Sequence, residues 1–415
     1  MNKLMNQITI ALIMIAFATS QQVADAELKA SLGSAALKPL EAQLNPTLRT
    51  AELKTDLLAK PLSDDLIAKP LLAAQLALKN NDLRAFVANQ NAYELKSWSA
   101  ALSPDLKYDD ASLRALLGAQ ADETDPNIAS AAEVPAETGR LLAALPNSYD
   151  LRSAYPGCWS IRYIRNQGQC GSCWAVAGAT SMSDRSCINK PFLWFLVSVQ
   201  KKRSFSYQDP LECCSHATCG TGHRKGCNGG KISGAFAFAQ QTGIVTGENY
   251  GNTTNCKNYF LAPHHAAAAA PACRAFCPTA GYGVSYNNDK RKILAYKVYT
   301  KAALGVAGVV SATKNAIFNR GTVTAYLDVY SDFFAYSQGV YVKTQGAVFK
   351  GGHAVRLIGW GANQIISTIF FKIELGPYWI GANSWGTGWG NGGFFYIRRG
   401  SNEVNIEHYV VEALL

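Results

Sequence analysis

The sequence of 415 residues has little charge and no long apolar segment. Only 16% of its residues are charged and 48% are apolar, which excludes a disordered chain and favours a folded protein with a sizeable core. No apolar run reaches the roughly 18 residues that a membrane-spanning helix requires, so we expect no membrane span. Basic patches with interleaved aromatic residues are missing, which argues against nucleic-acid binding. Motifs for phosphate, haem or metal binding are also missing, and we expect no cofactor and no metal.

Cysteine is absent from the first 157 residues, and all eleven cysteines lie between Cys158 and Cys277. Such a concentration is typical of proteins from oxidising compartments. At the N-terminus, Lys3 precedes an apolar run from Ile8 to Ala18 and then small residues, the pattern of a cleaved secretory signal. We therefore expect residues 1–20 to be a signal peptide, with cleavage as late as residue 26. The destination would be lysosomal, vacuolar or extracellular.

The two parts of the chain carry opposite charge. Residues 1–144 hold 13 Lys and Arg against 17 Asp and Glu, a net charge of −4, whereas residues 145–415 carry +14. Apolar positions at helical spacing from about residue 82 to 117 predict a mostly helical N-terminal part. The polar stretch 120–140 has no period and predicts an exposed linker, in or just after which the chain can be cleaved. We expect one unit at 21–144 and another at 145–415.

The second unit changes from helices to strands along its length. Helical spacing is seen at 173–188 and 232–241, and short β-branched or aromatic runs between glycines predict strands at 323–329, 340–343, 354–360, 378–381 and 394–398. This order indicates an α+β chain with two lobes. Two apolar runs, 191–199 and 365–375, interrupt the pattern. They fit surface insertions, with an extended hairpin as one form of the second, and errors in the gene model equally well.

The strongest chemical motif is QGQCGSCW at 167–174. The C-x-x-C within it could be a redox motif, but that would require a thioredoxin-like context, and nine further cysteines argue against it. The alternative makes Cys173 a nucleophile at a helix N-terminus, where unpaired N–H groups and the helix dipole lower the pKa of a thiol. The Gln167 side chain and the Cys173 backbone N–H could then stabilise a developing oxyanion.

A general base is available among six histidines. Only His353 begins an apolar strand behind a pair of glycines, and Asn383 follows another strand thirty residues later. An amide oxygen at Asn383 can hold the imidazole in the tautomer that a thiolate–imidazolium pair needs, and Trp385 can shield that hydrogen bond from water. Together these residues indicate nucleophilic catalysis.

These motifs resemble the papain family of cysteine proteases, whose signature is C-G-[SA]-C-[WY]. The resemblance extends from Leu145 to about Val411 and is closest to the cathepsin B branch, through segments such as 145–152, 183–185 and 226–230. It implies a papain-like two-lobe fold with a helical left lobe and a β-barrel-like right lobe. It also implies Cys173 as nucleophile, His353 as base, Asn383 as its orienting partner and Gln167 as oxyanion donor. The protein would be an endopeptidase zymogen without a cofactor, with possible dipeptidyl carboxypeptidase activity.

The resemblance further implies five disulfides and one free thiol. The implied pairs are Cys158–Cys187, Cys170–Cys227, Cys213–Cys273, Cys214–Cys219 and Cys256–Cys277. Sequence alone does not choose among connectivities. Cys273 and Cys277 with two histidines could also imitate a zinc site, but the pairing would use those thiols.

Substrate recognition is where the chain departs from the cathepsin B branch. By resemblance, Gly229, Gly230 and Trp385 contact the substrate. His264 and His265 stand where two histidines bind the substrate C-terminal carboxylate, but both cysteines that would pin their loop are missing, and Asn166 replaces the acid that clamps it. A loosely held loop predicts relatively more endopeptidase activity. The acid at the bottom of the second specificity pocket falls on Tyr409, which predicts a preference for apolar or aromatic residues over arginine.

Partners and modification complete the expectations. The substrates would be peptides and proteins, the acidic N-terminal unit would be an inhibitory propeptide, and the enzyme would be a monomer. Asn252 begins an N-glycosylation sequon. The competing hypothesis is a protease-like secreted protein that binds but does not cut.

Overall fold

The computed structural model describes residues 73–75, 77–78, 82–92, 97–133, 145–189, 204–220, 226–267, 269–363, 365–367, 372–374 and 376–415. The expected signal peptide, the end of the expected linker from residue 134, and the apolar run 191–199 lie outside these residues. Everything below concerns the compact unit that begins at Ala68.

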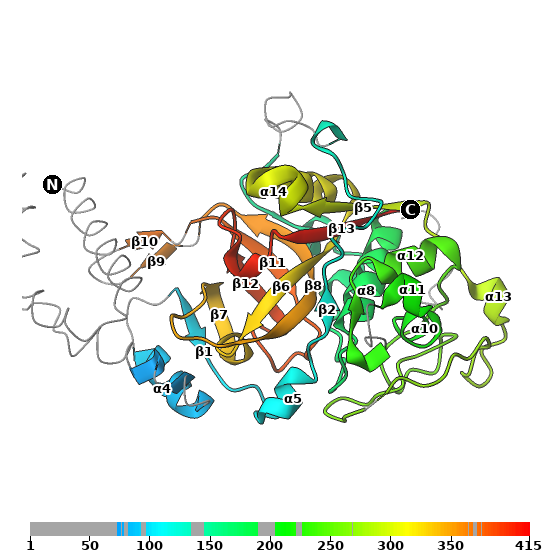
Figure 1. The fold of residues 1–415 in the computed structure, drawn as a ribbon, viewed down its shortest axis with the longest axis horizontal. Coiled ribbons are helices and arrows are strands. Elements are labelled where there is room, and N and C mark those ends of the chain that lie inside the picture. The colour runs from blue at the N-terminus through cyan, green and yellow to red at the C-terminus, as the bar shows by residue number, and fades with distance from the viewer. Residues whose placement is uncertain are drawn as a thin grey trace, which may run out of the picture. The chain divides into compact units, whose positions relative to one another are not determined.

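One sheet of nine strands forms half of this unit (Figure 1). Its strands are β1 (Trp98–Ala100), β3 (Tyr149–Asp150), β5 (Ala295–Thr300), β6 (Val323–Tyr330), β7 (Tyr336–Tyr341), β8 (Phe349–Gly361), β11 (Tyr378–Ala382), β12 (Phe394–Arg398) and β13 (Tyr409–Leu414). The order is β1-β7-β12-β11-β8-β6-β13-β5, with β3 also paired to β8. Since β1 and β5 form the two ends of this path, the barrel-like lobe expected from the sequence is an open sheet in the described part of the chain. The mixed two-lobe architecture itself is confirmed.

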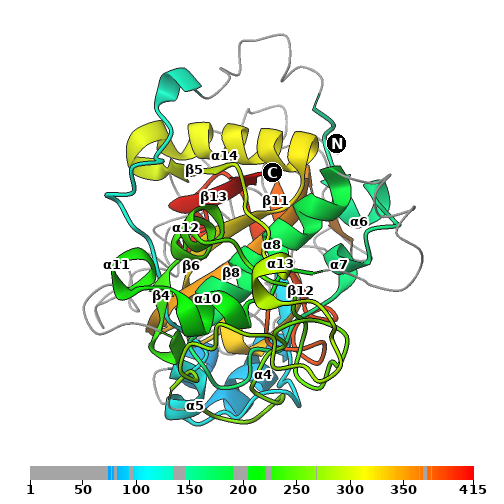
Figure 2. The same ribbon diagram turned by 90° about the vertical axis from the view of Figure 1, so that its right-hand side faces the viewer.

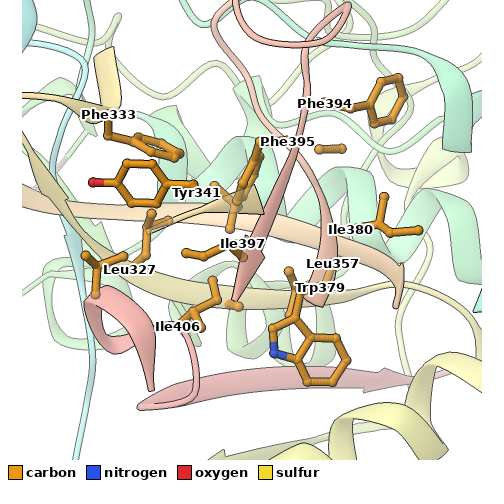
Figure 3. Packing of buried hydrophobic residues seen from close by; sticks show 14 of the residues in the cluster. Leu327, Phe333, Tyr341, Leu357, Trp379, Ile380, Phe394, Phe395, Ile397 and Ile406 are labelled. Carbon is orange, nitrogen blue, oxygen red and sulfur yellow. The ribbon is translucent and has the colours of Figure 1, made fainter. Parts of the chain in front are cut away.

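Aromatic and branched side chains fill the interior on one side of this sheet (Figure 3). The Phe333 ring packs edge-on against the rings of Tyr341 and Phe395, while Leu327 and Trp379 are fully buried below them. Alternating burial along β6 and β12 places their apolar residues in this core. The short helices η5 (Phe333–Ala335) and η6 (Glu403–Asn405) connect strands around it.

Helices form the other half. They are α6 (Leu151–Ala154), α7 (Trp159–Arg162), α8 (Cys173–Asn189), α10 (Gln208–Cys213), α11 (His216–Cys219), η4 (Gly226–Asn228), α12 (Gly234–Gln241) and α13 (Tyr286–Asp289). The central helix α8 is buried on nearly all sides. It can approach its neighbours closely because it is rich in small residues: a Cβ on Gly178 would lie 2.8 Å from the Cβ of Ala235 in α12. Its first residue, Cys173, is thereby fixed between the two halves.

The helix α14 (Lys301–Arg320), not predicted from the sequence, lies along β5 and β13 (Figure 2). Thr300 caps it through a hydrogen bond from the Ala303 N–H. Its first half is mostly exposed and contains a non-helical residue, Gly305, so an apolar stripe begins only at Val309. That late start explains why helical periodicity was not evident.

The N-terminal segment (residues 73–133) contains α4 (Leu83–Ala92), β1, α5 (Asp110–Arg114), β2 (Ala119–Gln120) and η3 (Ala131–Glu133). The prediction of helix throughout 82–117 is therefore wrong in its middle, where β1 extends the large sheet by pairing with β7. Tertiary pairing explains the difference, because Trp98 and Ala100 alternate inward with strand spacing. The strand β2 pairs with β4 (Gly230–Lys231) in the helical half.

Five disulfides cross-link residues 158–277. They join Cys158–Cys187, Cys170–Cys227, Cys213–Cys273, Cys214–Cys219 and Cys256–Cys277. Cys173 is the free thiol. The second apolar run contains a hairpin of β9 (Ile365–Ser367) and β10 (Lys372–Glu374). Among the described residues, no helix is both long enough and apolar enough to cross a bilayer.

Candidate active site

Cys173 opens α8 and is fully buried. The loop before it is fixed by the Cys170–Cys227 disulfide and by hydrogen bonds between Gly171 and Ser172 and neighbouring carbonyls. The first turn of a long helix thus presents its unpaired N–H groups around the sulfur, where they favour negative charge.

His353 and Asn383 are brought together from β8 and the end of β11. The Nε2 atom of His353 lies 2.8 Å from Oδ1 of Asn383, and the amide oxygen fixes this nitrogen as the donor. The Trp385 ring packs on the imidazole at 4.8 Å between centroids. Both His353 and Trp385 are buried, so water does not compete for the hydrogen bond.

Gln167 presents its side-chain amide to the cleft. Its oxygen accepts a hydrogen bond from the Ser384 hydroxyl at 2.6 Å, which orients the amide nitrogen toward two carbonyls. One is Cys170 O at 2.8 Å and the other is Leu116 O of the N-terminal segment at 2.9 Å. Gln167 therefore already binds a peptide carbonyl oxygen.

The N-terminal segment crosses the cleft directly over Cys173. Gly118 donates its N–H to Gly352 O and accepts from the Gly230 N–H, both at 2.9 Å. The approach is so close that a Cβ on Gly229 would lie 2.3 Å from Gly118 O, and only glycine is tolerated at that contact. The next residue, Ala119, lies in the same buried cluster as Cys173.

The crossing segment is not placed for cleavage. An attacked carbonyl needs its carbon at the sulfur and its oxygen at the oxyanion donors. Here the Leu116 carbonyl occupies Gln167, whereas the Ala119 N–H lies at the Cys173 sulfur. The segment also pairs with β4 in parallel. The segment therefore blocks the cleft without placing one of its own peptide bonds where it could be cleaved.

Burial changes the ionisation of both reacting groups. It raises the pKa of the Cys173 thiol to about 11, although N–H groups of Ala354, Trp174 and Ala119 act in the other direction. It lowers the pKa of His353 to about 4, against the hydrogen bond to Asn383. The Nδ1 atom of His353 has no hydrogen-bond partner among the described residues. The covered site thus holds a neutral thiol and a neutral imidazole that are not hydrogen-bonded to each other.

The residues expected to contact substrate lie on two sides of Cys173. Gly229 and Gly230 border the crossing segment, and the fully buried Tyr409 belongs to the same apolar cluster as Ile232 and Ala354. Burial raises the pKa of Tyr409 well above its ordinary range.

His264 and His265 are exposed on a loop on the other side. Gln169 donates its N–H to His265 O at 2.8 Å, and His264 adopts a positive φ of 65°. Asn166 accepts a hydrogen bond from the Gly168 N–H. The sequon residue Asn252 is half-buried in a turn, with its side-chain oxygen bound to Thr254.

Sequence reasoning missed four contributors to this site. They are Ser384 on Gln167, Tyr259 on the Gln167 carbonyl, and Leu116 and Gly118 in the cleft. The serine directly follows Asn383 and was within reach of motif analysis, whereas the others depend on tertiary placement. No cluster of three or more His, Cys, Asp or Glu side chains arranged to hold a metal occurs in the described part of the chain.

Comparison with known proteins places this site in context. The model of the "Papain family cysteine protease" matches residues 145–414. Cathepsin B-like cysteine proteinase 4 of Caenorhabditis elegans is 37% identical over 280 residues, covering 64% of this chain and 74% of the relative. Cathepsin B-like cysteine proteinase 3 of the same organism is also 37% identical, over 296 residues that cover 70% of this chain and 71% of the relative.

Solved structures agree on the fold. Procathepsin B S9 from Trypanosoma congolense is 29% identical, with a TM-score of 0.60 over 80% of this chain and 97% of that one. Digestive procathepsin L 3 of Tenebrio molitor is 18% identical, with a TM-score of 0.53 over 90% of this chain and all of that one, and supports the fold alone.

Proposed function

Since the chain belongs to the papain family and is a cathepsin B-like cysteine protease, we propose that Cys173 and His353 are the thiolate–imidazolium pair that cleaves its peptide substrates. The thiolate attacks the carbonyl carbon, while Gln167 Nε2 and the Cys173 N–H bind the oxyanion. His353 gives its proton to the leaving amine, and water then hydrolyses the thioester. Asn383 holds the imidazole in place throughout.

The observation that carries this proposal is the peptide backbone already bound in the cleft. Gln167 holds the Leu116 carbonyl, Gly230 and Gly352 hydrogen-bond Gly118, and the free thiol lies beneath them. A cleft that binds one peptide backbone by its amide and carbonyl groups can bind a substrate backbone by the same groups once residues 116–120 leave.

The test is activation of the full chain at acid pH, followed by an epoxide that alkylates active-site thiols. We expect the label on Cys173 and loss of both label and peptide cleavage in Cys173→Ala. His353→Ala should keep the thiol but slow labelling by about two orders of magnitude, as removal of a general base does.

The same experiment separates the enzyme from a silent binding protein. Processed wild-type chain that takes no label at any pH would favour the binding protein. Cleavage that persists in Cys173→Ala would overturn the assignment of the nucleophile.

We also propose that Tyr409 closes the second specificity pocket against basic side chains. The carboxylates that act on Tyr409, Asp122 and Asp125, belong to the N-terminal segment and would leave with it on processing. Substitution Tyr409→Glu should raise kcat/KM for arginine two residues before the cleaved bond about tenfold, the effect of a charged hydrogen bond. Peptide-library profiling of wild type, Tyr409→Glu and the control Tyr409→Phe measures this. A strong arginine preference in wild type would refute the assignment.

The balance between endopeptidase and dipeptidyl carboxypeptidase activity follows from the loop that carries His264 and His265. Both side chains are exposed, and Asn166 bonds to Gly168, which supports a loosely held loop with endopeptidase activity predominating. Processing just before Leu145 and glycosylation at Asn252 belong to the same proposal.

A further inference from the structure

Tyr259 lies against the loop that carries the two proposed oxyanion donors. Its ring is only 2% exposed and packs on the ring of Tyr207 at 4.7 Å between centroids. The backbone N–H of Tyr259 donates to the Glu248 carbonyl at 2.8 Å, which fixes this part of the chain. Leu261, two residues later, supports the same loop, since a Cβ on Gly168 would lie 2.8 Å from its Cδ2. The Tyr259 hydroxyl therefore reaches the loop from a firmly held ring.

This hydroxyl joins the two ends of the loop. It donates to the Gln167 carbonyl at 2.9 Å and lies 2.8 Å from the Ser172 hydroxyl. A carbonyl oxygen can only accept, so the one phenolic proton goes to Gln167, and Ser172 donates to the Tyr259 oxygen. Burial raises the pKa of Tyr259 well above its ordinary value. The phenol therefore keeps its proton, and with it both hydrogen bonds, through acid and neutral pH.

The first end of the loop positions the side-chain donor, Gln167. The backbone N–H of Gln167 donates to the Ser384 carbonyl at 2.9 Å, while its own carbonyl accepts from Tyr259. Hydrogen bonds thus hold the peptide groups on both sides of the Gln167 Cα atom. The side-chain amide leaves the backbone in a fixed direction as a result.

The second end positions the backbone donor, the N–H of Cys173. The Ser172 carbonyl accepts from the N–H groups of Ala175 and Val176 at 2.9 and 3.0 Å, at the start of α8. The peptide group between Ser172 and Cys173 is planar, so the direction of this carbonyl also sets the direction of the Cys173 N–H. A hydrogen bond on the Ser172 side chain therefore acts on the residue that orients the second donor.

We infer that Tyr259 is a positioning residue that holds the two oxyanion donors at a fixed separation, because its one hydroxyl binds the loop at both ends. It acts through Gln167 and Ser172 and is not itself a catalytic residue. Negative charge develops on the attacked oxygen only in the transition state, so displaced donors slow the reaction more than they weaken substrate binding. This inference rests on the proposed function and adds a residue to it.

The test is Tyr259→Phe in enzyme processed from the full chain, since this change removes one oxygen and keeps the ring. We expect kcat for a peptide amide to fall about tenfold, less than the roughly 10²–10³ that loss of a donor costs, with KM changed by less than about twofold. Affinity for a peptide aldehyde should fall by the same factor as kcat, because its oxygen occupies the oxyanion position once the sulfur adds to the carbonyl carbon. Alkylation of Cys173 by iodoacetamide forms no oxyanion and should keep its rate.

Three further variants separate positioning from packing. Tyr207→Phe is the matched control, since this buried neighbour directs its hydroxyl to Asn249 and not to the loop, and it should leave kcat unchanged. Ser172→Ala removes only the link to Cys173 and should lower kcat and aldehyde affinity several-fold, with alkylation unchanged. In a Gln167→Ala background, Tyr259→Phe should cost less than it does alone, because one donor that it positions is already gone.

Each outcome decides the inference. Unchanged kcat and aldehyde affinity in Tyr259→Phe, or in Ser172→Ala if Tyr259→Phe does not fold, overturns it. Alkylation that slows as much as cleavage, or an equal loss in Tyr207→Phe, would show a merely structural role and also overturn it. An undiminished effect in the Gln167→Ala background would overturn the action through Gln167. Wild type that neither takes label at Cys173 nor cleaves any peptide would instead overturn the proposed function.

Discussion

Burial keeps the proposed catalytic pair, Cys173 and His353, uncharged in the structure that includes the N-terminal segment. The pKa of Cys173 is raised to about 11 and that of His353 is lowered to about 4, so between these pH values both groups are neutral in the covered state. A neutral thiol is a poor nucleophile. The same residues at the N-terminus of α8, once hydrated, are expected to exchange a proton and become charged.

Thiol alkylation as a function of pH checks this. In the unprocessed chain the rate of reaction with iodoacetamide should stay low through neutral pH and rise only toward pH 11, because the raised pKa keeps the thiol protonated. In the processed chain the rate should already be high near pH 6. A pH-independent, rapid reaction of the unprocessed chain would contradict the account, and Cys173→Ser supplies the background.

Sequence motifs identified the residues whose chemistry is specific to their type. Cys173, His353, Asn383 and Gln167 stood out because each sits in a recognisable local context. Asp105 of the N-terminal segment did not, because its carboxylate accepts a hydrogen bond from the N–H of Gly388, which lies 283 residues away and is brought to it by folding. Spacing along the chain contains no such information.

At the scale of elements, β1 fastens the N-terminal segment to the sheet. The Trp98 ring packs on Phe86, Tyr336 and Tyr341, and its Nε1 donates to the Val342 carbonyl at 2.9 Å. It is 3% exposed. This contact also explains why periodicity failed here, since three residues of strand cannot be read from spacing when the partner strand lies more than 230 residues later.

Removing that ring should loosen the N-terminal segment. Trp98→Ala should destabilise its attachment by about 3–5 kcal/mol, the usual cost of deleting a buried aromatic side chain. Limited proteolysis of the segment should then become faster, and the unprocessed chain should show basal peptidase activity. Trp98→Phe keeps an aromatic ring, so its rate of proteolysis and its basal activity should lie between those of wild type and Trp98→Ala. Unchanged proteolysis in Trp98→Ala would show that β1 is not an anchor.

At the scale of the whole chain, opposite charges face each other across the cleft. The acids belong to the N-terminal segment and the bases to the rest, in the pairs Asp110–Lys350 and Asp122–Lys231. Hydrogen bonds from Lys350 and Arg114 hold the pKa of Asp110 below its ordinary value. The contribution of the Asp110 carboxylate to stability is complete above the ordinary pKa of an aspartate. It is lost as the pH falls through the lowered pKa of Asp110.

Ionic strength should therefore modulate activation. Screening lengths fall from about 10 Å at 0.1 M salt to about 3 Å at 1 M, so at fixed pH the full chain should be processed faster in high salt. Cleavage of a small neutral peptide by processed enzyme corrects for direct effects of salt on catalysis. Asp110→Asn should reduce the salt dependence, whereas the exposed control Glu133→Gln should not. Processing that slows in salt would contradict this electrostatic contribution.

The placement of sulfur has a consequence for where the enzyme can work. All ten disulfide-bonded cysteines lie in residues 158–277, as does the free thiol of Cys173, the proposed nucleophile, and the strands from residue 295 onward contain no cysteine. A strongly reducing medium that keeps the Cys173 thiol reduced would also reduce the disulfides between residues 158 and 277. The strands from residue 295 onward have no disulfide to lose. The enzyme thus suits an intermediate redox potential. Excess reductant should inactivate it by opening the disulfide-bonded part of the chain and not by acting on the strands.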